Sequence, residues 1–184
     1  MAEAEVSLRL AEYLSELDGF AGHVDVAIDG ASVSVGGAIV FEISAYLQSQ
    51  GWMKIEGLPK SKNDWTGIYK RASATLRVHS RSGIGDVVAS IDGRMIIAEC
   101  KKGPLVTKPG SPERPLLNNA LGQALLINAS DTDIVVAAVP DSPAFRKLAE
   151  VWRERPRLKR AGIQIVLVNR DGSVAGLTIK ASQK

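Results

Sequence analysis

DVVASIDGRMIIAECK, residues 86–101, is the most informative segment of this 184-residue chain. Two apolar runs rich in β-branched residues flank Asp92-Gly93, a dipeptide typical of tight hairpin turns. The segment therefore predicts two antiparallel strands joined by a short turn. Because side chains alternate along a strand, Glu99 and Lys101 would project from one face, roughly 6.6 Å apart along it. Cys100 would point the other way, into the core, as a small apolar residue.

The hairpin can bring Asp86, at the start of its first strand, beside Glu99 on the second. Two neighbouring carboxylates repel each other and raise one pKa unless a cation lies between them. Mg²⁺ suits such a position, since it takes oxygen ligands and retains several waters. It would polarise a phosphodiester and activate a bound water, while Lys101 orients that water or stabilises charge on the phosphate. The alternative interpretation is an ion-pair cluster on a surface hairpin.

The run Gly85-Asp86 followed by Glu99-Cys100-Lys101, on a hairpin before a helix and an apolar strand, resembles the PD-(D/E)XK nuclease superfamily. The resemblance covers about residues 37–140. Gly85 stands where the family has proline. The resemblance implies a restriction-endonuclease-like αβββαβ core, with a mixed central sheet flanked by helices.

The same resemblance implies roles for individual residues. Asp86 and Glu99 would hold Mg²⁺ (or Mn²⁺), the backbone carbonyl of Cys100 is a further candidate ligand, and Lys101 would serve the attacking water as base or orienting group. Family members often supply another acid from the first core helix, where Glu42 is expected; a solvated helix glutamate is the equal alternative.

Three further side chains are candidate supporting residues. Gln123 is expected on the helix after the hairpin, where some RecB-like nucleases carry a glutamine. The tyrosine four residues later in that pattern is Ile127 here, so a surface role for Gln123 is at least as well founded. Arg81 and Lys102 flank the motif and could touch phosphate, or be solvated.

Around this core, the sequence predicts an α/β protein. A helix at 4–18 and a hairpin of 23–28 with 31–35 around Asp29-Gly30 would make residues 1–36 an N-terminal helix–hairpin extension. Residues 37–184 would be the nuclease domain. It would begin with a helix over 38–50, and its second half would alternate helices with buried apolar strands, which favours a mixed sheet.

Charge is distributed unevenly along the chain. Residues 1–59 carry nine acids and two bases, a net charge of −7, whereas residues 60–184 carry 11 acids and 21 bases, a net charge of +10. A basic body of this kind suits a polyanion, although chance clustering on a solvated surface is the alternative. We expect DNA, which most of the resembling family cuts. The candidate contacts lie in two loops: Lys60, Lys62, Trp65, Lys108 and Arg114.

These observations predict a Mg²⁺-dependent DNA endonuclease. The alternatives are a Holliday-junction resolvase-like enzyme and a non-catalytic nucleic-acid-binding subunit on the same fold. A single cysteine, an acidic start without a signal-peptide pattern and apolar runs far below the ~20 residues of a membrane span predict a cytoplasmic protein without a membrane partner.

Cutting both strands would favour a homodimer, held through the N-terminal extension. The apolar stripe of its helix must be buried either there or on the chain's own core: Val6, Leu10, Tyr13, Leu14 and Leu17.

Overall fold

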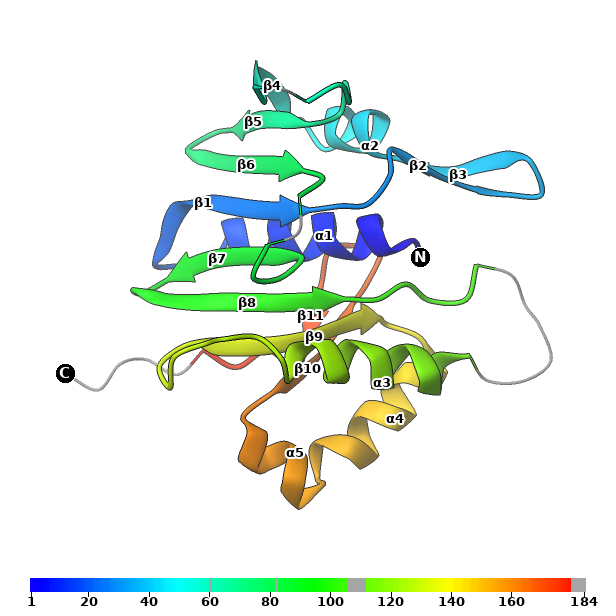
Figure 1. The fold of residues 1–184 in the computed structure, drawn as a ribbon, viewed down its shortest axis with the longest axis vertical. Helices are drawn as coiled ribbons and strands as arrows, with labels where there is room; N and C mark the ends of the chain where they lie inside the picture. Colours follow the sequence, from blue (N-terminus) through cyan, green and yellow to red (C-terminus); the bar gives the residue numbers. More distant parts are fainter. Residues whose placement is uncertain (60, 82, 106–111, 180–184) are drawn as a thin grey trace.

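The computed structural model describes residues 1–59, 61–81, 83–105 and 112–179 (Figure 1). Within them, the strands of the main sheet are β1 (Phe20–Ala27), β4 (Met53–Gly57), β5 (Gly67–Arg71), β6 (Ala74–His79), β7 (Val87–Ile91), β8 (Arg94–Cys100), β9 (Ile134–Pro140), β10 (Gln164–Val168) and β11 (Val174–Ala175). The remaining elements are α1 (Glu3–Ser15), α2 (Ile43–Ser49), α3 (Glu113–Ala124), α4 (Pro143–Arg153), α5 (Pro156–Ala161) and a hairpin of β2 (Ser32–Val35) with β3 (Ala38–Glu42).

The main sheet is mixed, in the order β11-β10-β9-β8-β7-β1-β6-β5-β4. Strand β8 pairs antiparallel with β7 and parallel with β9, and β9 pairs parallel with β10. Strand β1 pairs antiparallel with β7 and parallel with β6. The prediction of an α/β protein with a large mixed sheet between helices is confirmed.

The predicted hairpin of residues 86–101 is confirmed as β7 and β8. Asp92 and Gly93 form the turn with φ angles of 50° and 73°, both in the left-handed region. This turn matches the right-handed twist of the two strands. It fixes the register, in which Val87 lies opposite Ala98 and Ile91 lies opposite Arg94.

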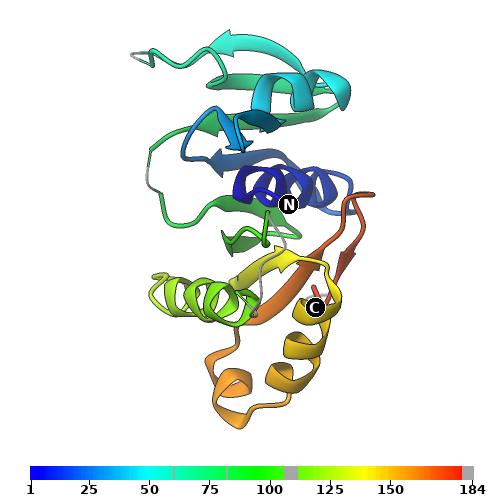
Figure 2. The same ribbon diagram turned by 90° about the vertical axis from the view of Figure 1, so that its right-hand side faces the viewer.

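Helices cover the two faces of the sheet unequally. Helices α1 and α2 share one hydrophobic core with the apolar sides of β1, β6, β7 and β8, including Cys100. Helices α3 and α4 build a second core on the opposite face, over β9 and β10. Figure 2 shows α1 and α2 on one side of the sheet and α3 on the other. On the α3 side, the half of the sheet made by β1, β6 and β5 has no helix over it among the described residues.

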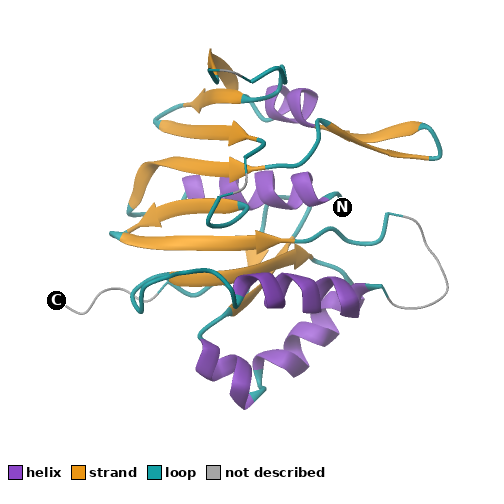
Figure 3. Ribbon diagram, in the orientation of Figure 1, coloured by secondary structure: helices purple, strands orange, loops and turns teal. Residues whose placement is uncertain are grey.

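The predicted hairpin of residues 23–28 with 31–35 is wrong. Strand β1 lies inside the main sheet, between β7 and β6, and β2 pairs with β3 across a turn at Gly36-Gly37 (Figure 3). Both of these glycines have positive φ, 57° and 83°, as a tight hairpin turn requires. The local turn signal at Asp29-Gly30 was outweighed by pairing partners far along the chain, which bury Val24 and Val26 under α1. Residues 1–36 therefore supply β1, a central strand of the main sheet, and α1, which packs against that sheet.

The helix predicted over 38–50 begins later, because residues 38–42 form β3 and α2 starts at Ile43. Strand β5 was missed, since its sequence follows a polar loop and shows no clear alternation. The predicted helices after residue 110 and the buried strands between them are present as α3, β9, α4 and β10. None of the helices in the described ranges is long and apolar enough to cross a membrane.

Helix α1 has its apolar side buried against the chain's own sheet. Val6, Leu10 and Leu14 are fully buried, and Tyr13 and Leu17 pack against the same core while partly exposed. The structure thus follows the fold-back alternative. Because the apolar stripe of α1 is buried within the chain, it gives no reason to expect a dimer through this segment.

Glu12, a buried glutamate on α1, connects this helix to α2 and β5, near the β4–β5 edge of the sheet. Glu12 accepts a hydrogen bond from the Tyr46 hydroxyl and another, of 2.9 Å, from the indole Nε1 of Trp52. Arg71 on β5 places a guanidinium nitrogen 3.8 Å from the same carboxylate. These contacts join α1, α2 and β5 through one charged side chain.

Candidate active site

The β7–β8 hairpin places Asp86 next to Glu99. Asp86 directly precedes β7, and its backbone N–H donates at 2.8 Å to the carbonyl of Ala98, the residue that Val87 also faces. Asp86 and Glu99 line the same cavity at this end of the hairpin. The Cys100 backbone N–H donates to Asp86 Oδ2 at 2.8 Å and fixes the carboxylate over the end of β8. The sequence-based expectation that the hairpin unites Asp86 and Glu99 is confirmed.

Gly85 has a steric explanation. A Cβ atom at this position would lie 2.8 Å from Ile97 Cγ2 and 3.1 Å from the Ala98 carbonyl oxygen. Contacts of this length would push the chain away from β8 and carry Asp86 with it. The close approach of the two backbones therefore favours glycine before the aspartate.

Lys101 follows directly on β8 and lies at the centre of the acidic groups. Its side-chain nitrogen is 3.9 Å from Asp86 Oδ2 and 3.1 Å from Glu3 Oε1, and the residue is 9% exposed. The second oxygen of Glu3 accepts from the Lys102 backbone N–H at 3.4 Å. Glu3 was missed by sequence reasoning. It lies 98 residues before Lys101, in the first turn of α1, and no local pattern connects the two.

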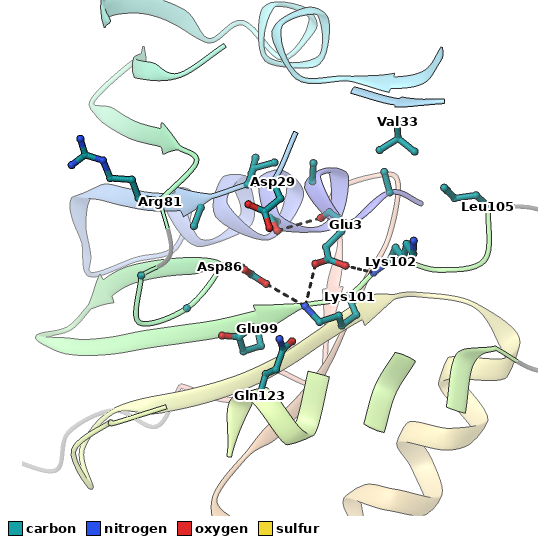
Figure 4. Close-up of a pocket in the computed structure, with 17 residues that line it drawn as sticks. Glu3, Asp29, Val33, Arg81, Asp86, Glu99, Lys101, Lys102, Leu105 and Gln123 are labelled. Atoms are coloured by element: carbon teal, nitrogen blue, oxygen red, sulfur yellow. Dashed lines mark hydrogen bonds and ion pairs between the residues drawn. The ribbon is translucent and has the colours of Figure 1, made fainter. Parts of the chain in front are cut away.

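A cavity of about 510 Å³ opens at this end of the sheet. Figure 4 shows acidic side chains around it from four segments, with Lys101 between Asp86 and Glu3. The predicted supporting residues Arg81, Lys102 and Gln123 all line the cavity. Asp29, expected to be a turn residue, also lines it.

Burial and mutual repulsion perturb the acids. Burial raises the pKa of Asp86, although the Cys100 N–H and Lys101 oppose this shift. Burial, followed by the charge of Asp86, raises the pKa of Glu99 from 4.5 to about 7. Burial alone would lower the pKa of Lys101, but the charges of Glu3 and Asp86 outweigh it and the pKa is raised. The site therefore holds a firmly protonated lysine beside two carboxyl groups that resist ionisation.

Cys100 is fully buried, and burial raises the pKa of its thiol well above the ordinary value. This agrees with the expectation of a core residue rather than a nucleophile.

Glu42 does not lie in this cavity. Because α2 begins at Ile43, Glu42 is its N-cap, and its carboxylate accepts from the N–H groups of Ser44 and Ala45 at 3.0 and 2.6 Å. The expectation that Glu42 joins the site from the first core helix is therefore wrong. The acid that reaches the site from a helix is Glu3.

The candidate DNA-contacting residues lie at different places. Trp65 is 5% exposed and packs in the core of α1 and α2, so its ring is not available to a base. Lys62 is exposed, and Arg114 is exposed on α3 with its guanidinium 6.0 Å from the Trp152 ring centroid. Lys60 and Lys108 lie outside the described residues.

Within the described ranges, no group of three or more His, Cys, Asp or Glu side chains has the arrangement of a metal site. Comparisons with protein-family models, curated proteins and solved structures found no match.

Proposed function

We propose that this chain is a Mg²⁺-dependent deoxyribonuclease that hydrolyses phosphodiester bonds within DNA. The observation that carries the proposal is the convergence of Asp86, Glu99 and Lys101 at one end of the sheet, in a cavity of about 510 Å³.

The order and pairing of the elements support this proposal. Taken in chain order, α1, β1, β7, β8, α3 and β9 have the αβββαβ sequence of a restriction-endonuclease-like core. Their strands form a mixed sheet, in which β1, β7 and β8 pair antiparallel and β8 and β9 pair parallel. On this assignment the first core helix is α1 rather than the expected 38–50 helix. Residues 28–86 are then an insertion between the first two core strands.

The donor groups fit a hard divalent cation. Asp86 and Glu99 supply carboxylate oxygens from the two sides of one hairpin, at the same end of it. The N–H and C=O of a strand residue point to the same side, so the Cys100 carbonyl faces Asp86 as its N–H does. Oxygen donors of this kind are those that Mg²⁺ prefers. The raised pKa values of both acids are what a shared cation would reverse.

When bound, the metal would supply Lewis-acid activation of the phosphodiester and of a water molecule. The chain's own residues supply position and charge. Asp86 and Glu99 would hold the metal at the end of the β7–β8 hairpin and so determine where the phosphodiester reacts. Lys101, protonated because of its acidic neighbours, is suited to donate hydrogen bonds to the attacking water or to a phosphate oxygen. Hydrolysis forms a bond from the water oxygen to phosphorus and breaks the bond to the leaving oxygen, which takes up a proton.

The test is cleavage of supercoiled plasmid by the full-length protein in Mg²⁺ and in Mn²⁺. Asp86→Asn, Glu99→Gln and Lys101→Met should each reduce cleavage by at least about a hundredfold, a loss typical for one preorganised group. Glu56→Gln, at an exposed position on β4, is the matched control and should cut at the wild-type rate. Full activity in any of the three site variants would refute the assignment.

Four-way junctions should be offered beside linear duplex in the same assay. A strong preference for the junction would narrow the activity to that of a resolvase. Binding without cleavage by the wild-type protein would instead favour a non-catalytic nucleic-acid-binding subunit.

A further inference from the structure

A second cavity, of about 380 Å³, lies next to the acidic one, and Arg81 lines both. Figure 4 shows the Arg81 side chain pointing away from Asp86 and Glu99. Its guanidinium can therefore serve the second cavity while its backbone borders the first. The two cavities form one continuous surface through this residue.

The second cavity has the opposite chemistry to the first. The described residues that line it include the bases Arg77, His79 and Arg81 and the hydroxyl groups of Ser61, Thr66 and Ser80, and no acid. Guanidinium groups and hydroxyls are the side chains that contact phosphate oxygens in nucleic-acid complexes. Arg77 is well placed for this, because its side chain is 44% exposed on the open half of the sheet.

Strand register places both sites on the same face of the sheet. Arg77 lies opposite Asp25, Asp25 lies opposite Val88, and Val88 lies opposite Ile97, two residues before Glu99. Residues opposite each other in a sheet, and those two apart on a strand, share a face. Helix α3 covers this face beyond β8, whereas the half that carries Arg77 has no helix over it among the described residues.

The separation suits a polynucleotide. From β6 to β8 is three strand spacings, about 14 Å across the sheet. Along the axis of a duplex, this distance corresponds to about four base-pair steps of roughly 3.4 Å each. A strand whose scissile phosphate lies at Asp86 and Glu99 would thus have neighbouring phosphates over β1 and β6.

We propose that Arg77 and Arg81, with the hydroxyl groups of Ser61 and Ser80, bind the phosphates of the DNA strand that flank the bond to be cut. This rests on the proposed function. The open half of the sheet is then the main DNA-binding surface, and Ser61, in one of the two loops indicated by the sequence, borders it.

Asp25 sets the geometry of this surface. Its Oδ1 is 3.4 Å from Arg77 Nη1 and 3.6 Å from His79 Nε2, and its Oδ2 is 3.3 Å from His23 Nε2. The carboxylate holds Arg77 and His79 in place on the sheet and offsets part of the Arg77 charge. Affinity would therefore come from several modest phosphate contacts, and it would depend steeply on salt.

The experiment measures binding of a fluorescein-labelled 24-base-pair DNA duplex to the full-length protein by anisotropy, in Ca²⁺ and from 50 to 200 mM salt. Arg77→Ala/Arg81→Ala is compared with wild type. The matched control is Arg157→Ala/Arg160→Ala, which removes the same charge from exposed positions on α5, at the opposite end of the molecule. Arg77→Lys/Arg81→Lys retains the charge, and circular dichroism checks that each variant is folded.

The Arg77/Arg81 alanine variant should bind at least tenfold more weakly at 50 mM salt. Two lost phosphate contacts reduce the log–log salt slope by about 1.8, so the wild type should lose about twelvefold more affinity than this variant across the salt range. The lysine variant should keep most of the slope, and the α5 control should bind within twofold of wild type. Equal affinities of the Arg77/Arg81 and α5 alanine variants would overturn the proposal.

Plasmid cleavage in Mg²⁺ by the same proteins separates the two proposals. If the wild type cuts DNA while the Arg77/Arg81 variant binds and cuts normally, this inference fails and the nuclease assignment stands. If the wild type binds DNA through Arg77 and Arg81 but cuts none, the nuclease assignment fails and the binding surface stands.

Discussion

Replacing Glu99 by glutamine should stabilise the metal-free protein, even though it destroys the proposed activity. The folded protein raises the pKa of this carboxyl from 4.5 to about 7, through burial and the charge of Asp86. A raised carboxyl pKa means that the folded state binds the proton more tightly than the unfolded state does. Below pH 4.5 the ionisation of Glu99 therefore leaves the free energy of unfolding unchanged. As pH rises from 4.5 to about 7 that ionisation lowers the free energy of unfolding, which stays lowered at higher pH.

The size of the effect follows from the shift. A change from 4.5 to about 7 corresponds to an upper bound of about 3.5 kcal/mol, at about 1.4 kcal/mol per pKa unit. Glu99 is partly exposed to solvent, which screens its charge, so we expect about 1 to 2 kcal/mol. Glutamine has nearly the same shape and no charge. The variant should thus be more stable than wild type by this amount at pH 8, and equally stable at pH 4.

The assay is urea unfolding of both proteins in EDTA at pH 4, 6 and 8. Glu56→Gln, an identical chemical change at an exposed residue, should show no pH-dependent difference from wild type. Adding Mg²⁺ at pH 8 should stabilise wild type more than Glu99→Gln, because a cation bound to the folded state adds stability by mass action. The electrostatic reasoning would be refuted if Glu99→Gln were no more stable than wild type at pH 8. It would also be refuted if the variant were stabilised by the same amount at pH 4 as at pH 8.

Two further predictions concern contacts of α1. Glu12→Ala leaves the hydroxyl of Tyr46 and the indole N–H of Trp52 without their buried acceptor, so it should cost about 2 to 5 kcal/mol in chemical unfolding at pH 7; a loss under 1 kcal/mol would contradict this. Glu3→Gln removes a charge 3.1 Å from Lys101 Nζ and so lowers the pKa of that lysine. If Lys101 must be protonated to act, the alkaline limb of the cleavage-rate profile should move to lower pH, and an unchanged profile would argue against that role.

Local segments explain which parts of this fold could be predicted from the sequence. The β7–β8 hairpin is closed by a two-residue turn, so Asp86, Glu99 and Lys101 could be brought together from spacing alone. Helix α1 was visible from its apolar period, and β9 and β10 from their length and β-branched residues. The partners of β1 could not be predicted, since its neighbour β6 is about 50 residues away in the sequence. His23 on β1 lies opposite Thr75 on β6. A turn-forming dipeptide says nothing about such distant pairing, and the strand was assigned to the wrong hairpin.

The same limitation accounts for the misplaced acid. A helix can supply a carboxylate to the site when its first turn lies at the end of β8, and that depends on where the helix packs. Glu42 was selected because a helix was expected to begin at residue 38, directly before the next strands. Once β2 and β3 pair instead, Glu42 caps α2. Helix α1 packs along β1 and β7, so its first turn meets the end of β8 and Glu3 reaches Lys101. The residues between β1 and β7 thus separate Glu3 from its site in sequence, while the packing of α1 on β1 and β7 brings the two together in space.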